Sequence, residues 1–243
     1  MYGESRRGVL STTICATVTL ARALSGPRSP HNAYLFLNSG AVARRTRCEE
    51  QYNVYVSNDS SALILRAAAF AAHKHRGQPR KDKAATPYIN HPIAVACLLS
   101  DEAGITDPVV LAAALLHDTI EDTETTHEEL VAAFGAAIGN VVAEVTDDKS
   151  LLKEDRKRLQ VERAAYLSHK AKLVKIADKI CNLRDIVYSP PDWTIERNRK
   201  YFEWARQVVD QMQGAHQILE LLFDSAHSHE ISFHPNDCNF IEG

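Results

Sequence analysis

Helix start and stop signals recur along the chain between residues 58 and 223. Asp107 followed by Pro108 places a capping residue directly before a proline at the first helical position. Thr126, with Glu129 three residues later, is the pattern of a capping box. Because we find no series of β-branched runs that alternate with period two, a sheet is not expected. The sequence therefore predicts an all-α fold.

Composition separates the first 47 residues from the rest of the chain. They hold seven arginines, no lysine and a single acidic residue, which is typical of a mitochondrial transit segment. A disordered extension or a gene-model artefact is the alternative. We expect one helical bundle over residues 58–223, flanked by flexible extensions at 1–57 and 224–243. A cytoplasmic protein is expected, with a mitochondrial one as the alternative if the first segment directs import.

Charge and cysteine content exclude several classes of protein. The net charge of −3 gives no basic footprint for nucleic acid or for a membrane surface. Five cysteines are widely spaced and form no CxxC pair, so neither a disulfide framework nor a zinc ribbon is expected. No nucleic-acid partner and no membrane partner is therefore expected.

Four ionisable residues interrupt the apolar stretch "AALLHDTIEDT". His117 and Asp118 are followed within one turn by Glu121 and Asp122. Withdrawing such groups from water costs several kcal/mol unless they are paired, hydrogen-bonded or bound to a metal. If residues 109–122 form one helix, His117 and Glu121 share a face of it. The stretch therefore indicates a site.

Further metal-ligand candidates stand in other apolar segments. His91 opens a predicted helix beside Pro92, and Asp178 lies inside the apolar run "KLVKIADKICNL". Two imidazoles with two carboxylates suit Mn²⁺, Fe²⁺ or Zn²⁺ better than Ca²⁺. Three other histidines are expected at the surface or in local caps: His73, His75 and His127.

Five motifs occur in an order that resembles a known family. "AHKHRGQPRK", "TPYINHPIAVA", "AALLHDTIEDT", "VTDDK" and "KIADKICNLRD" resemble the hydrolase domain of the RelA/SpoT family, one of the HD-domain phosphohydrolases. The resemblance runs from about residue 67 to about residue 222 and is greatest to the stand-alone animal branch. It implies a single HD-domain helical bundle.

The resemblance also implies a role for each site residue. It makes the ligands of one Mn²⁺ ion His91, His117, Asp118 and Asp178. It assigns the attacking water to Glu121 and Asp122. It places at the nucleotide Arg80, Lys81 and Asn182, and more loosely Lys153, Arg197 and Tyr201.

The activity that the resemblance implies is removal of the 3′-pyrophosphate of guanosine 3′,5′-bis(diphosphate) (ppGpp), which yields GDP and pyrophosphate. An alternative is removal of the 2′-phosphate of NADPH, because both substrates carry phosphate on a secondary hydroxyl of ribose. A more distant alternative is an inactive nucleotide sensor. All four ligand positions and both acids are present, which favours an enzyme.

Overall fold

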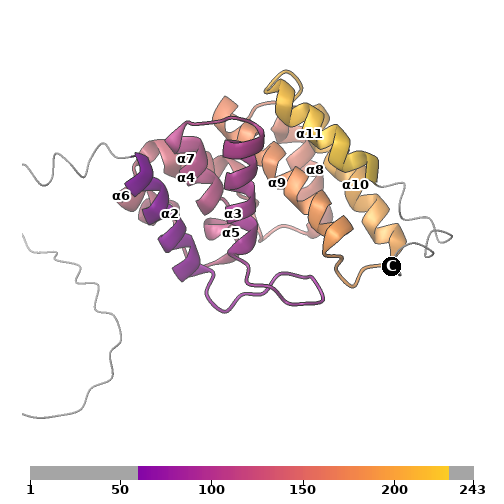
Figure 1. Cartoon of the computed structure of the whole chain (residues 1–243), viewed down its shortest axis with the longest axis horizontal. Coiled ribbons are helices and arrows are strands. Elements are labelled where there is room, and N and C mark those ends of the chain that lie inside the picture. The colour runs from indigo at the N-terminus through magenta and orange to yellow at the C-terminus, as the bar shows by residue number, and fades with distance from the viewer. Residues whose placement is uncertain (1–59, 230–243) are drawn as a thin grey trace, which may run out of the picture. The chain divides into compact units, whose positions relative to one another are not determined.

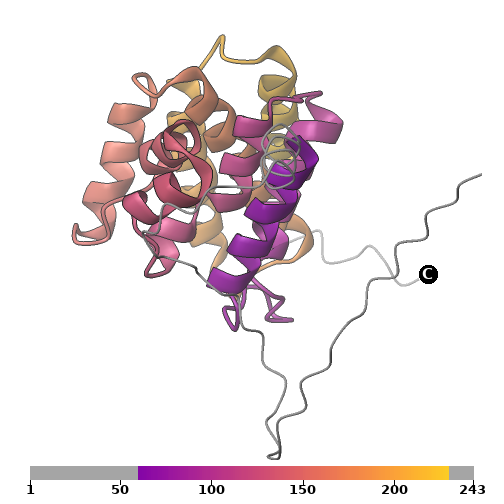
Figure 2. The ribbon, with the colours of Figure 1, turned by 90° about the vertical axis from the view of Figure 1, so that its left-hand side faces the viewer.

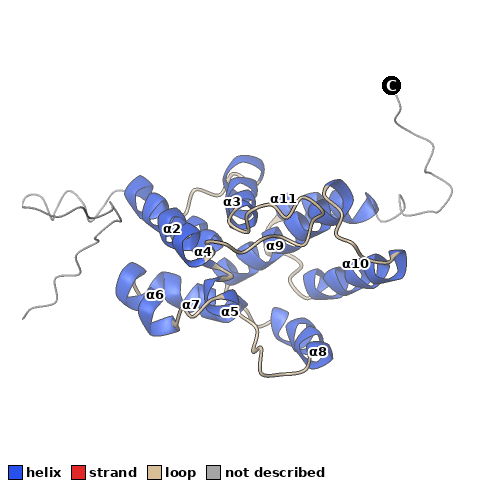
Figure 3. Cartoon of the chain, turned by 90° about the horizontal axis from the view of Figure 1, so that it is seen from below, coloured by secondary structure: helices blue, strands red, loops and turns tan. Residues whose placement is uncertain are grey.

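The computed structural model describes residues 60–229, and in this range the chain forms helices joined by loops, as Figures 1 and 3 show. The elements in chain order are α2 (Ser60–Lys74), α3 (Asn90–Cys97), the π-helix η1 (Leu98–Glu102), α4 (Pro108–Leu116), α5 (Thr119–Asp122), α6 (His127–Phe134), α7 (Ala136–Val145), α8 (Lys153–Ala164), α9 (His169–Tyr188), α10 (Ile195–Asp210) and α11 (Gln217–Ser228). Within the described range the only β structure is two isolated bridges. The all-α prediction is confirmed. Residues 1–57, expected as an extension, lie outside the described residues.

The predicted caps account for the starts of two helices. Asp107 Oδ1 accepts a hydrogen bond from the backbone amide of Val109 over 2.9 Å, with Pro108 next to it at the start of α4. Thr126 Oγ1 accepts from the amide of Glu129 over 3.2 Å at the start of α6. The capping box is only half formed, because the Glu129 carboxylate pairs with Lys74 of α2 at 2.8 Å.

The helix predicted over residues 109–122 is interrupted between α4 and α5. The ring Nδ1 of His117 donates to the carbonyl oxygen of Ala114 over 2.8 Å. The hydroxyl of Thr119 donates to the carbonyl oxygen of Leu116 over 2.7 Å. Side chains thus bond two carbonyls at the end of α4 that a continuous helix would give to its backbone amides. Residues 109–122 therefore do not form the single helix on which the shared face of His117 and Glu121 was conditional.

Helices α4 and α9 form the centre of the bundle. From Val110 to Leu116, α4 is buried throughout, and α9 is buried over most of its length. α2, α3 and α7 pack on α4, while α10 and α11 pack on α9. The loop between α2 and α3 projects from one end of the bundle in Figures 1 and 2. In the described range, no helix has the length and apolar character needed to cross a membrane.

The C-terminal part of the bundle extends beyond its expected end. The periodic stretch 194–223 forms two helices, α10 and α11, joined by a turn in which Gly214 has φ +81°. α11 continues to Ser228, so the first residues of the tail expected at 224–243 are helical. Ala226 is buried, and His227 Nε2 lies 3.3 Å from the carbonyl oxygen of Phe202. Contacts with α9 and α10 therefore accompany this extension of the helix.

Candidate functional site

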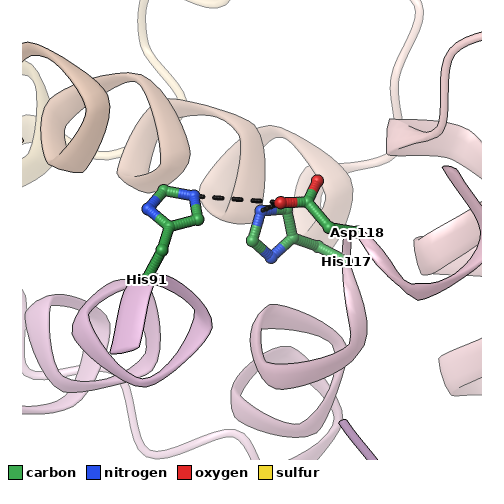
Figure 4. Close-up of side chains that lie close together, drawn as sticks. All are labelled: His91, His117 and Asp118. Atoms are coloured by element: carbon green, nitrogen blue, oxygen red, sulfur yellow. Dashed lines mark ion pairs between the residues drawn. The ribbon is translucent and has the colours of Figure 1, made fainter. Parts of the chain in front are cut away.

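Four side chains from three parts of the bundle converge on one point. His91 comes from α3, His117 and Asp118 from the junction of α4 and α5, and Asp178 from α9. His91 Nε2 lies 3.2 Å from Asp178 Oδ1, and His117 Nε2 lies 3.1 Å from Asp118 Oδ2. The crossed pairs are 4.0 Å (His91 and Asp118) and 3.7 Å (His117 and Asp178). Figure 4 shows the side chains of His91, His117 and Asp118 directed toward one another.

The chemistry of this cluster fits a divalent cation. Because His117 Nδ1 donates to a backbone carbonyl, the buried Nε2 is directed toward Asp118 and Asp178 and is the ring atom that would bind a metal. Burial opposes a charge on His117, yet Asp118 and Asp178 raise its pKa to about 10, so the position favours a positive charge. Two nitrogen and two oxygen donors are a set that suits first-row divalent metals. HD hydrolases bind a divalent metal, and His91, His117 and Asp118 lie close enough together to hold one.

A second set of contacts orients the carboxylates of the cluster. The Tyr88 hydroxyl lies 2.6 Å from Asp118 Oδ2 and 2.8 Å from Asp122 Oδ2. On α9, Asn182 Nδ2 donates to Asp178 Oδ1 over 2.5 Å, and Lys179 Nζ donates to Asp178 Oδ2 over 3.2 Å. Burial raises the pKa of Tyr88, and both aspartates raise it further, so the phenol keeps its proton. The only feature of the sequence that could have pointed to Tyr88 is its position three residues before His91.

The acid pair lies beside the cluster and contacts the loop between α7 and α8. Glu121 Oε2 accepts a hydrogen bond from the backbone amide of Asp147 over 3.2 Å, and Arg156 Nη1 lies 3.8 Å from the same carboxylate. Burial, then the charges of Asp147 and Asp118, raise the pKa of Glu121. Asp122 forms an ion pair with Lys149 of this loop. One loop therefore holds both acids.

Arg80 connects the projecting loop to α9. Its Nη2 donates to Asn182 Oδ1 over 3.0 Å and pairs with Asp185, and the guanidinium stands 5.5 Å from the centre of the Tyr88 ring. Lys81 is exposed on the same loop. Asp185 was not among the predicted residues. Its signal is the spacing from Asp178 and Asn182, which places all three on one face of α9.

Residues of α8, of α10 and of the segment just before α10 form a further wall of the site, which carries cations and aromatic rings. The Arg197 guanidinium lies 4.0 Å from the centre of the Trp193 ring, and the Tyr201 and Trp204 rings are 5.3 Å apart, edge to face. Lys179 Nζ stands 4.3 Å over the Trp204 ring. Lys153 is exposed at the start of α8. The two tryptophans were not predicted; Trp204 follows Tyr201 by three residues in α10, and Trp193 lies just before that helix begins.

His75 departs from its expected place at the surface. It is buried, its Nδ1 lies 2.9 Å from Gln78 Oε1, and its ring stacks on Tyr88 at 4.7 Å. The chain turns back after α2, which brings the end of that helix against the approach to α3. His75 is therefore part of the support behind the cluster.

All twelve residues that the sequence predicted as metal ligands, catalytic acids or substrate contacts line a single cavity of about 1900 Å³. The metal-ligand cluster and the acid pair lie along one part of its wall, and the cations and rings of α8 and α10 along another. Such a cavity can hold a phosphorylated compound with its phosphate near the cluster and its ring system against the aromatic wall. The roles of these twelve residues as metal ligand, general base or substrate contact stay predictions.

Comparison with known proteins gives relatives over most of the described range. The HD domain family matches residues 67–202. The protein named guanosine-3′,5′-bis(diphosphate) 3′-pyrophosphohydrolase MESH1 from Xenopus tropicalis is 57% identical over 164 residues, which cover 67% of this chain and 92% of that protein. The MESH1 protein from Homo sapiens is 59% identical over 161 residues, which cover 66% of this chain and 90% of that protein.

A solved structure resembles this one over the same range. It is described as a metazoan ortholog of SpoT that hydrolyzes ppGpp and plays a role in starvation responses. Its TM-score is 0.67 at 50% sequence identity, and the match covers 69% of this chain and 95% of that one. These relatives, the matched HD domain and the four converging ligand candidates together show the family of this protein. The chain belongs to the HD-domain hydrolases related to RelA/SpoT, in their stand-alone animal branch.

Proposed function

We propose that this protein is a divalent-metal-dependent phosphohydrolase that converts ppGpp and water to GDP and pyrophosphate. The observation that carries the proposal is the convergence of His91, His117, Asp118 and Asp178 beside an acid pair in one large cavity. The relatives of known name, which this chain matches over nine tenths of their length, support the same substrate.

The proposed cofactor is one Mn²⁺ ion per chain, held by the four converging side chains. Mixed nitrogen and oxygen ligands support Mn²⁺ over the larger, oxygen-preferring Ca²⁺. When bound, such an ion supplies Lewis-acid activation of water and of the phosphoryl group. His117 is already oriented for this role by its hydrogen bond to Ala114.

The acids of the chain handle the proton of the reaction. A water molecule transfers a proton to the Glu121 carboxylate while its oxygen bonds to the phosphorus that is joined to the ribose 3′ oxygen. The bond between that phosphorus and the 3′ oxygen breaks, and the 3′ oxygen takes up a proton to become the hydroxyl of GDP. The raised pKa of Glu121 suits a general base. Asp122 orients the same water.

The cationic residues of the cavity bind the substrate. Arg80 and Lys81 reach the purine and its phosphates from the projecting loop, beside Asn182. Lys153, Arg197 and Tyr201 contact the nucleotide from the wall that α8 and α10 form. Arginine serves such a site because its planar guanidinium both pairs with phosphate and stacks on a base.

A second candidate is removal of the 2′-phosphate of NADPH. The observation that favours it is the volume of the cavity, about 1900 Å³, which exceeds the range of about 300–1000 Å³ typical of small-molecule sites. A dinucleotide occupies more of such a space than a mononucleotide does. The aromatic wall offers a stacking surface for its second base.

A nucleotide panel tests the proposal. The full chain, loaded with Mn²⁺, is incubated with ppGpp, NADPH, GTP and dGTP, and products are identified by chromatography and mass spectrometry. We expect GDP and pyrophosphate from ppGpp, no reaction with GTP or dGTP, and no reaction in the Asp178→Asn variant. Comparable kcat/KM for GTP would contradict the substrate assignment, and binding of ppGpp without turnover would favour the nucleotide sensor.

We propose a cytoplasmic location, with mitochondrial import as the alternative that the arginine-rich first 47 residues support. Fluorescent fusions of the full chain and of a chain lacking residues 1–57 distinguish the two. Mitochondrial signal that requires residues 1–57 would overturn the cytoplasmic location.

A further inference from the structure

One hydroxyl group contacts both a metal-ligand candidate and a member of the acid pair. The Tyr88 oxygen lies 2.6 Å from Asp118 Oδ2 and 2.8 Å from Asp122 Oδ2. Oδ2 is the same Asp118 oxygen that faces His117 Nε2 at 3.1 Å. Tyr88 therefore touches the side of Asp118 that faces the centre of the cluster.

A tyrosine has one proton to donate, and here two carboxylates accept it. Without that donor, the two like charges would repel each other and rotate apart toward water or toward other cations. Such a cation lies next to Asp122: Lys149, in the loop between α7 and α8, pairs with the other carboxylate oxygen of Asp122, Oδ1. The phenol thus opposes the pull of Lys149 and keeps Asp122 beside Asp118.

The tyrosine ring is itself held in place. It stacks on the buried ring of His75, with centroids 4.7 Å apart, and the backbone amide of Tyr88 donates to the carbonyl oxygen of Gln78 over 2.8 Å. The Gln78 side chain continues this network, since its Nε2 donates to the carbonyl oxygen of Asp122 over 2.8 Å. Both the side chain and the backbone of Asp122 are therefore tied to one support.

We propose that Tyr88 is a positioning residue whose hydroxyl joins the metal site to the acid pair and fixes Asp122 for its work on water. This inference rests on the proposed function. It assigns to Tyr88 an action through Asp118 and Asp122, with no contact to the reacting phosphorus.

The Tyr88→Phe variant tests this assignment, because it removes the hydroxyl and keeps the ring that stacks on His75. Mn²⁺ affinity is measured on the metal-free protein by calorimetry, and steady-state kinetics with ppGpp follow at saturating Mn²⁺. Loss of a partner behind a metal ligand typically costs about 10- to 100-fold in metal affinity or activity. We expect a loss of this size in Mn²⁺ affinity and in kcat, with little change in KM or in melting temperature.

Two comparisons separate positioning from a general structural role. Tyr188→Phe is the matched control, because Tyr188 is 69% exposed and does not line the cavity, and it should leave kcat unchanged. In a double-mutant cycle, Tyr88→Phe should cost much less in the Asp122→Asn background than in the wild type. Equal costs in the two backgrounds would overturn the proposal.

The remaining outcomes are equally decisive. Full recovery of kcat at saturating Mn²⁺ would show that the hydroxyl serves only Asp118, and the proposed link to Asp122 would fail. Wild-type kcat and Mn²⁺ affinity in Tyr88→Phe would overturn the whole inference while leaving the proposed function intact. A wild-type protein that does not hydrolyse ppGpp would instead contradict the proposed function.

Discussion

His117 donates a hydrogen bond from its Nδ1 to the carbonyl oxygen of Ala114, three residues earlier, over 2.8 Å. This contact fixes the ring and leaves Nε2 facing Asp118 and Asp178. The same contact occupies a carbonyl at the end of α4, so the interruption of the helix and the orientation of the ligand have one cause. The site is thereby organised before an ion binds.

Removing one carboxylate from the cluster should release the metal. In Asp178→Asn the side chain loses its charge and one of its two acceptor oxygens, so we expect the metal content to fall well below one ion per chain and ppGpp hydrolysis to be lost. Elemental analysis and product assays measure both. Asp185→Asn, on the same face of α9, is the control and should keep its metal. Full occupancy with wild-type turnover in Asp178→Asn would refute the ligand assignment.

Glu121→Gln should separate catalysis from binding. The change is nearly isosteric and removes only the basic carboxylate, so we expect kcat to fall by about 10²- to 10⁴-fold, the usual contribution of a general base. Metal content and substrate affinity should be preserved. The exposed neighbour Glu124 provides the control in Glu124→Gln. If metal is lost together with activity, Glu121 is a ligand and its assignment as base is wrong.

The acid limb of the pH profile should depend on Asp147. Burial raises the pKa of Glu121, and the Asp147 carboxylate raises it further. The active base is the ionised form, so kcat falls as pH drops through this raised pKa. In Asp147→Asn the backbone amide still donates to Glu121 but the charge is gone, so the acid limb should move to lower pH. A limb that stays in place or moves upward would disprove the assignment.

Arg80→Ala should mainly raise KM for ppGpp. The proposed contact of the guanidinium with the nucleotide exists before and during the reaction alike, so its loss should weaken binding of the ground state and of the transition state together. Lys83→Ala is the control, because Lys83 is exposed on the same loop and does not line the cavity. Initial-rate kinetics give both constants. A fall in kcat without a rise in KM would show that Arg80 acts on the chemical step.

Stability should respond to the cap of α4. Asp107→Ala removes the acceptor for the Val109 amide, which typically costs about 1 kcal/mol. For a domain of this size, such a loss lowers Tm by about 2–4 °C. Asp107 also pairs with Lys170, so Lys170→Ala measures the ion pair alone and should have the smaller effect. Equal shifts from the two variants would mean that the cap contributes nothing measurable.

The fold was predictable from the sequence wherever the signal is local. Asp107 and Thr126 cap the helices expected of them. The ligand candidates could be found in the same way, because His91, His117 and Asp178 are polar residues inside apolar stretches. A charge in such a stretch is a departure from helix periodicity that a single sequence reveals.

Other features depended on partners far away in the chain. The contacts of Tyr88, His75 and Asp185 in the site could not be predicted, because their partners are side chains from other elements. Arg80 and Asp185 are 105 residues apart in sequence, and Gln78 and Asp122 are 44 apart. The extension of α11 to Ser228 is likewise accompanied by contacts with α9 and α10.

The sequence by itself thus determined the helices, through caps and periodicity that act within a few residues. It also identified the ionisable site residues, because they stand inside apolar stretches. Only the tertiary structure decided how those groups meet. It placed Glu121 against the loop of Asp147, set Tyr88 between Asp118 and Asp122, and brought Trp193 and Trp204 into the cavity that the cluster lines. The physical reason is range: capping and helix periodicity are local, whereas burial and hydrogen bonding between helices depend on how the whole bundle packs.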